Sequence, residues 1–217
     1  MAVYATWRLS YDKLDASARS FLQICSLLHH EGISEQMFKQ AALSPLRLAE
    51  FKLQNEVTQL LEQLGKHDSQ WCSWEFLQVV KSLRSCSFIE YDDRNCMYSV
   101  HPLVQHWSGT TIGNQKKDMK ICVLSIIGLS VPWTLNKEYI HQHTLLKHIT
   151  NCMGSLNPKE IDPLVALHLA LVFYEQGHWG NAEVLQMTVM EKRMQALGEN
   201  HPDTLQSMGG LCGIYRN

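Results

Sequence analysis

Apolar residues recur at helical spacing through most of the chain, so the sequence predicts a mostly α-helical protein. Asp15 is placed to cap a first helix that ends near Gly32, and Ser34 is placed to cap a shorter second helix. Pro45 suits the first turn of a longer helix, for which Gly65 is the expected stop.

The pattern changes its period in the next segment. A helix led by Ser73 has apolar positions at Trp74, Leu77, Val80 and Leu83. Residues 88–91 and 97–100 then read as two short strands around a turn, and Pro102 suits the start of a following helix. Helices, a hairpin and a further helix follow one another in a winged helix-turn-helix, which we place at residues 4–110.

A helical spacer is predicted for residues 111–160. Its most apolar stretch, residues 121–133, is about 13 residues long, whereas a membrane span needs about 20. We therefore expect a buried helix there and no membrane partner.

In the C-terminal part, a pattern of residues repeats after 42 positions: Leu169, Ala170 and Phe173 are followed by the similar residues Leu211, Cys212 and Tyr215. Recurrence of a helix-face pattern at one period predicts stacked helical hairpins. We assign residues 161–217 to one complete repeat and one partial repeat. The last helix carries Leu205, Leu211, Ile214 and Tyr215 with no following helix to cover them, which favours self-association through it.

The charge and the cysteines indicate which partners and which cellular compartment to expect. The net charge is -2, and residues 1–110 carry ten Lys and Arg against twelve Asp and Glu. A DNA reader neutralises several phosphates, but the helix before the hairpin offers only Lys81 and Arg84, so nucleic acid is not the expected partner. The seven cysteines include no C-x-x-C pair, and no apolar signal core opens the chain, which favours the cytoplasm.

The N-terminal part resembles a known family. Residues 7–14, with the sequence Trp-Arg-Leu-Ser-Tyr-Asp-Lys-Leu, resemble the winged-helix segment of STAND-type (NB-ARC, NOD-like) ATPases, those of fungi most of all. Residues 100–105, Val-His-Pro-Leu-Val-Gln, are similar to that family's Met-His-Asp-Leu-Val-Gln motif. The resemblance implies that His101 contacts the β-phosphate of bound ADP. The residues themselves also allow His101 to cap the helix that Pro102 opens.

The C-terminal hairpin resembles tetratricopeptide repeats of the kinesin-light-chain type, over residues 169–177, 182–183 and 197–205. This resemblance implies a protein or peptide partner on the concave face, around His168 and Glu175. The repeat family often carries Asn where this chain has His168 and Gly210.

No sequence signature for catalysis is present. The chain has no G-x-x-x-x-G-K-[ST] loop to hold a triphosphate, and no nucleophile and base share a local motif. His141, His143 and His148 cluster on one predicted helix with Cys152, but only His148 and Cys152 have ligand spacing, so no metal site and no cofactor are predicted.

Together these features predict a non-enzymatic, cytoplasmic interaction protein that resembles the C-terminal part of a STAND ATPase without its nucleotide-binding core. Two alternatives stay open at this point. One is a winged-helix regulator that binds DNA, and the other is a truncated remnant without independent function.

Overall fold

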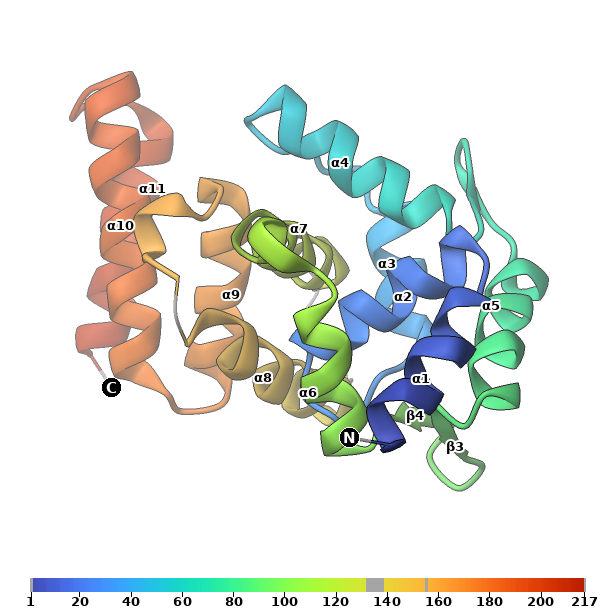
Figure 1. Ribbon diagram of the computed structural model, residues 1–217. Coiled ribbons are helices and arrows are strands. Elements are labelled where there is room, and N and C mark those ends of the chain that lie inside the picture. The colour runs from blue at the N-terminus through green and yellow to red at the C-terminus, as the bar shows by residue number, and fades with distance from the viewer. Residues whose placement is uncertain (1, 132–138, 155, 217) are drawn as a thin grey trace.

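The computed structural model describes residues 2–131, 139–154 and 156–216, and it consists mostly of α-helices, as predicted (Figure 1). The N-terminal helices are α1 (Ala2–Asp12), α2 (Ala16–Leu27), α3 (Glu35–Leu43), α4 (Phe51–Glu62), α5 (Ser73–Ser85) and α6 (Pro102–Thr110). The later helices are η1 (Gly113–Gln115), α7 (Lys116–Ser130), α8 (Tyr139–Met153), η2 (Pro158–Glu160), α9 (Pro163–Glu175), α10 (Trp179–Leu197) and α11 (Pro202–Tyr215).

Strands are short and pair as two antiparallel hairpins in the described part of the chain. Strand β1 (Lys66–His67) pairs with β2 (Gln70–Trp71), and β3 (Glu90–Asp92) pairs with β4 (Met97–Ser99). A bridge between Ile33 and Tyr98 ties the second hairpin to the segment before α3. The predicted strand–turn–strand segment is therefore confirmed.

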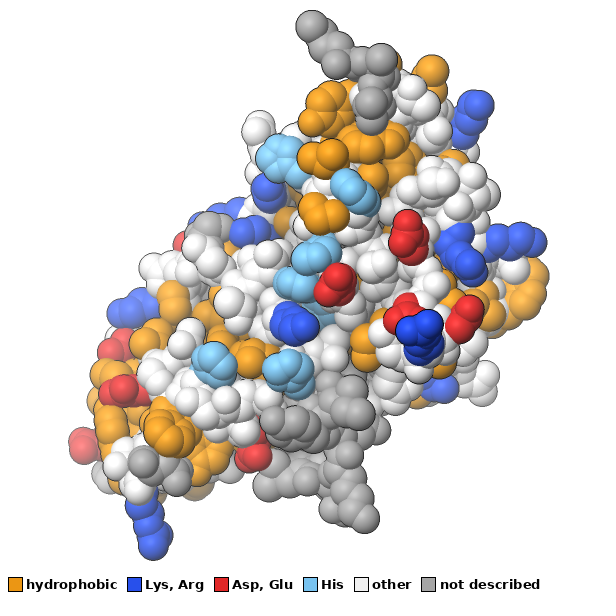
Figure 2. All heavy atoms as spheres, turned by 90° about the horizontal axis from the view of Figure 1, so that it is seen from below, with side chains coloured by type: hydrophobic (Ala, Val, Ile, Leu, Met, Phe, Trp, Pro, Cys, Tyr) orange, Lys and Arg blue, Asp and Glu red, His pale blue; other side chains and the backbone are white. Residues whose placement is uncertain are grey.

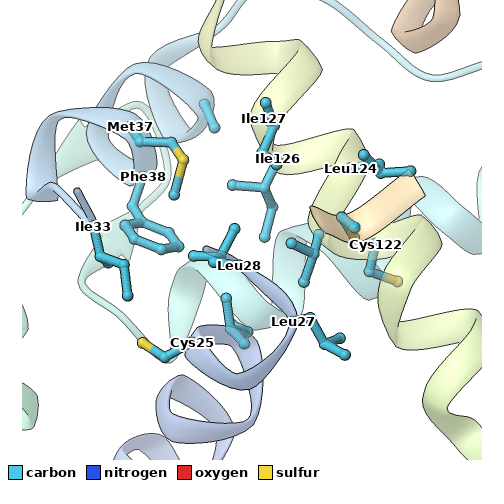
Figure 3. Close-up of a cluster of buried hydrophobic side chains, with 14 of the residues drawn as sticks. Cys25, Leu27, Leu28, Ile33, Met37, Phe38, Cys122, Leu124, Ile126 and Ile127 are labelled. Atoms are coloured by element: carbon cyan, nitrogen blue, oxygen red, sulfur yellow. The ribbon is translucent and has the colours of Figure 1, made fainter. Parts of the chain in front are cut away.

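One continuous cluster of buried side chains runs from α1 to α10. Near its N-terminal end the ring of Phe21 lies 5.3 Å from the rings of both Phe38 and Phe76, edge to face. In Figure 3, Leu28 and Phe38 point toward Ile126 on α7. Helix α7 packs against α3 on one side and α9 on the other, and all its residues from 122 to 130 are buried, as predicted for this apolar stretch.

Side chains from distant elements cap the C-terminus of α2. The Gln105 amide of α6 donates to the Leu28 carbonyl at 2.6 Å. The Asn151 amide of α8 donates to the carbonyls of Leu27 and Leu28, both at 2.9 Å. Because helix ends leave carbonyls without intrahelical partners, these bonds fix α6 and α8 to the end of α2.

Buried His148 of α8 adds to this contact between α8 and the end of α2, which we call the histidine joint. Its Nδ1 accepts the backbone N–H of His29 at 3.0 Å, and its Nε2 donates to the Gly32 carbonyl at 3.0 Å. The rings of His29 and His30 lie beside it, 4.3 Å apart, and histidine side chains form a band across the face seen in Figure 2. The two backbone bonds require the neutral form of His148 with the proton on Nε2.

Two predicted helix boundaries are wrong. Helix α4 begins at Phe51 rather than Pro45, because side chains take the preceding amides: Ala49 N–H donates to Asp162 Oδ2 at 2.7 Å and Leu48 N–H to Gln54 Oε1 at 2.9 Å. Helix α2 ends at Leu27 rather than near Gly32, since the cap from α6 and α8 closes it earlier.

Candidate partner-binding groove

A groove of about 300 Å³ separates α9 from α11. Its walls are mostly apolar: Leu167, Ala170, Leu171 and Tyr174 from α9, Gln186 from α10, and Gly210, Gly213 and Ile214 from α11. Helix α9 is apolar on nearly all sides, which is typical of a helix with partners on more than one face. One face packs on α7 and α10, and Leu167 and Leu171 on the groove side stay partly exposed.

The Gln186 side chain in the groove explains why α11 has a glycine at position 210. Gln186 is buried and its amide donates to the Ser207 carbonyl at 3.1 Å. A Cβ at Gly210 would clash with that amide, so a glycine lets α10 and α11 approach. Gly210 is therefore a packing residue at the position where the repeat resemblance led us to expect Asn.

His168 does not face a partner, so its prediction as a partner-binding residue is wrong in this structure. Its side chain is only 1% exposed, and its Nδ1 donates to the Gly128 carbonyl of α7 at 2.7 Å. Burial lowers the pKa of His168, and the hydrogen bond to Gly128 opposes this shift only in part. A Cβ at Gly128 would lie 2.9 Å from the Val165 side chain, which shows how closely α7 packs on α9. This close packing covers His168.

Glu175 remains compatible with a partner-facing role. It is exposed, and it lies four residues after Leu171 and eight after Leu167, so the three residues share one face of α9. The row of apolar side chains along the groove therefore ends in a carboxylate at the C-terminus of α9.

The C-terminal helix is only partly uncovered. Leu205 and Tyr215 are 52% and 65% exposed, as expected, whereas Leu211 is buried and Ile214 packs against the core cluster. The Tyr215 hydroxyl donates to Glu183 Oε1 at 2.6 Å, which fastens the end of α11 to α10. The prediction of an exposed apolar face therefore fails for Leu211, because α10 already covers this side of α11.

His101 is exposed and caps α6. Its Nδ1 accepts the Leu103 N–H at 3.2 Å. His201 caps α11 in the same way, accepting the Asp203 N–H at 3.2 Å, and each histidine precedes a proline at the first helical position. The residue-based alternative for His101 is thus observed, and its Nε2 points to no hydrogen-bond partner among the described residues.

The three buried cysteines are thiols rather than activated nucleophiles. Burial raises the pKa of Cys25, raises that of Cys152 to about 12, and, with a smaller effect of Glu56, raises that of Cys122 to about 12. Among the side chains that the structure describes, no three from His, Cys, Asp or Glu are grouped for a metal ion, and the side chain of His141 is not among those described. Across the same residues, no helix has both the length and the hydropathy of a membrane span.

Residues 9–117 match the family model described as "Domain of unknown function (DUF7779)", which is just over half of the chain. The chain belongs to the DUF7779 family. The DUF7779 region begins within α1 and ends in the first turn of α7, so it contains both hairpins and the caps of α2 from α6 but not those from α8. Comparison with curated proteins and with solved structures found no match.

The groove residues Leu167, Leu171, Tyr174 and Gln186 lie beyond the DUF7779 region and were missed by sequence reasoning. A usable signal was the apolar character of α9 on all sides. The repeat resemblance drew attention to the polar residue His168 instead.

Proposed function

We propose that this chain is a non-enzymatic interaction protein that binds a peptide segment of a partner protein in the groove between α9 and α11. The observation that carries the proposal is the row of partly exposed apolar side chains on α9. They face glycines of α11 across a groove with a volume of about 300 Å³. Grooves between stacked helices bind peptides through apolar anchors, and no reacting group is needed for that task.

The proposal includes a winged-helix segment like that of STAND ATPases and a short array of tetratricopeptide repeats. Support for a winged helix comes from the order of α2, α3, α5, the β3–β4 hairpin and α6. Support for tetratricopeptide repeats comes from the hairpin α9–α10 and from α11, which packs against α10. All seven cysteines are free, which supports a cytoplasmic protein, and DNA binding or a remnant without function remain the alternatives.

Two glycines of α11 provide a matched test. Gly213 lines the groove, whereas Gly209 is exposed outside it, and a Cβ at either position meets no neighbouring atom within 4 Å. Gly213→Leu should fill the groove, and both Gly213→Leu and Gly209→Leu should favour the helix, since glycine disfavours helices by about 1 kcal/mol. Comparison of the two variants therefore separates filling of the groove from a change in helix propensity.

The experiment selects peptides from a random-sequence display library on the whole chain and measures their affinities by fluorescence anisotropy. We expect a class of enriched peptides to bind the Gly213→Leu variant at least about tenfold more weakly than wild type, and to bind Gly209→Leu equally well. If no enriched peptide binds Gly213→Leu more weakly than wild type, the groove is not a binding site.

A further inference from the structure

Helix α5 has two apolar faces, and only one of them lies in the core. Phe76, Val79, Val80 and Leu83 are buried against α2 and its neighbours. On the outside of the helix, Trp74 is 67% exposed and Leu77 is 48% exposed. Sequence analysis assigned Trp74 and Leu77 to the apolar face together with Val80 and Leu83, so their exposure is unexplained by folding.

The exposed face of α5 forms one wall of a second cleft. In Figure 1, α5 lies at the outer edge of the molecule, next to the β3–β4 hairpin. The cleft between them has a volume of about 730 Å³, with Leu77, Lys81 and Arg84 on the helix side and Tyr91 and Tyr98 on the hairpin side. Its surface is thus mixed, apolar and basic, whereas the α9–α11 groove is mostly apolar.

The two basic side chains are available to a ligand. Lys81 and Arg84 are exposed and form no ion pair with another residue that the structure describes. The Arg84 guanidinium lies over the Tyr91 ring, 5.8 Å from its centre. A guanidinium stacked on a ring keeps its N–H edge free, and that edge matches the two oxygens of a carboxylate.

The lining of the cleft also includes an acidic side chain, Glu35. Glu35 Oε1 accepts the indole N–H of Trp71 at 2.7 Å. The cleft therefore presents Leu77 and, nearer the end of α5, the cations Lys81 and Arg84. The exposed Trp74 lies one helical turn before Leu77, at the edge of this lining. A partner of complementary chemistry carries an apolar side chain followed by acidic residues.

We propose that the cleft between α5 and the β3–β4 hairpin binds an acidic segment of a partner protein, with an apolar anchor on Trp74 and Leu77 and carboxylates on Lys81 and Arg84. Duplex DNA fits less well, because it requires several phosphate contacts and the lining of the cleft includes only two basic side chains. This site is separate from the α9–α11 groove and does not depend on the function proposed for it.

The test is a counter-selection with the whole chain. Random-sequence displayed peptides that bind wild type are retained, and those that also bind the double variant Lys81→Glu/Arg84→Glu are removed. We expect the remaining peptides to be rich in Asp and Glu with at least one large apolar residue. Their affinity should fall at least about tenfold in Trp74→Ala and should weaken as salt is raised.

Matched controls separate charge from location. The double variant Arg47→Glu/Lys52→Glu makes the same change in charge at exposed positions of the segment around α4, and it should leave the affinities unchanged. The groove variant Gly213→Leu should also leave them unchanged, so the failure of one site is distinguishable from the failure of the other. Circular dichroism confirms that each variant is folded.

Three results would overturn the proposal. The first is that no acidic peptides remain after counter-selection. The second is that a duplex DNA probe binds more tightly than the selected peptides and loses affinity in Lys81→Glu/Arg84→Glu. The third is a concentration-dependent dimer in light scattering that Trp74→Glu abolishes, because a second copy would then occupy the cleft.

Discussion

The C-terminal end of α2 and the contact between α10 and α11 rest on different kinds of interaction. The end of α2 is capped by Gln105 of the DUF7779 region and by Asn151 of α8, which are about eighty and more than a hundred residues away in sequence. At α11, Arg193 of α10 donates to the Asp203 carbonyl and to Ser207, both at 2.9 Å and within 14 residues. Long-range contacts make a region fold as a unit, whereas neighbour contacts allow one helix to open alone.

From this difference we expect a rigid part and an adjustable part in the same chain. The groove for which we propose peptide binding lies between α9 and α11, where closure rests on neighbouring helices. The α5 cleft lies on the rigid part, since Phe76 on the inner face of α5 is held against Phe21 and Phe38. We therefore expect the groove to adapt to its ligand and the α5 cleft to bind with little rearrangement.

Core truncations in the two parts should have different consequences. Phe21→Ala should destabilise the whole chain by about 3–5 kcal/mol, because it empties the centre of the aromatic cluster. Leu211→Ala should instead increase amide exchange in α11 and leave exchange in α2 unchanged. Thermal unfolding and hydrogen exchange measure both effects, and faster exchange in α2 of Leu211→Ala would contradict the comparison.

The histidine joint between α2 and α8 should contribute less than the aromatic core. His148→Leu leaves the His29 N–H and the Gly32 carbonyl without their bonds to the imidazole, at a combined cost of about 1–3 kcal/mol, because both groups are only partly buried. The exposed His143 on the same helix is a matched control, and His143→Ala should change stability little. Chemical denaturation of both variants tests this, and equal stabilities would show that the joint is not a structural contact.

Acidification should weaken the α7–α9 contact through His168. Its pKa is lowered in the folded state by burial, so the unfolded chain binds this proton first as the pH falls below about 6.5. Stability is therefore lost from there down to the folded pKa, by at most about 1.4 kcal/mol per pH unit for one proton. His168→Gln keeps a donor for Gly128 but does not titrate, so its stability should fall less between about pH 7.5 and about pH 5.5. An equal fall in both proteins would exclude His168 as the cause.

Local signals predicted much of the helical content. The caps at Asp15 and Ser34, the hairpin after α5 and the buried helix α7 all follow from residues within a few positions of one another. Helix α1 and the β1–β2 hairpin were not predicted. In the hairpin, each strand has only two residues and therefore no measurable alternation of apolar and polar positions.

The errors come from contacts between distant residues. Asp162 lies more than a hundred residues after Ala49, yet its carboxylate takes the amide that a helix from Pro45 would have used. The same limit applies to the site: the sequence shows that His168 is polar, but only the packing of α7 on α9 shows that it is covered. Spacing on α5 likewise places Trp74 on one apolar face with the buried Leu83, without showing that Trp74 itself lies outside the core.

The smallest expected effects concern the two histidine caps, which allow a direct comparison between the two parts. His101→Ala and His201→Ala should each lose about 1 kcal/mol of helix capping, and Asn at either position should restore most of it through its side-chain oxygen. The loss at His101 should appear in global unfolding, because Trp107 of the same helix stacks on Phe88 in the core. The loss at His201 should appear as local exchange in α11.

The same pair of variants decides whether His101 has a second role. Titration calorimetry with ADP compares wild type with His101→Asn, which keeps the cap and removes the imidazole. We expect identical heats, because this chain has no glycine-rich loop whose backbone amides would hold the phosphates. A heat that is present in wild type and in His201→Asn but absent in His101→Asn would instead establish the nucleotide contact that the STAND resemblance implies, with the exposed Nε2 of His101 as the donor to phosphate.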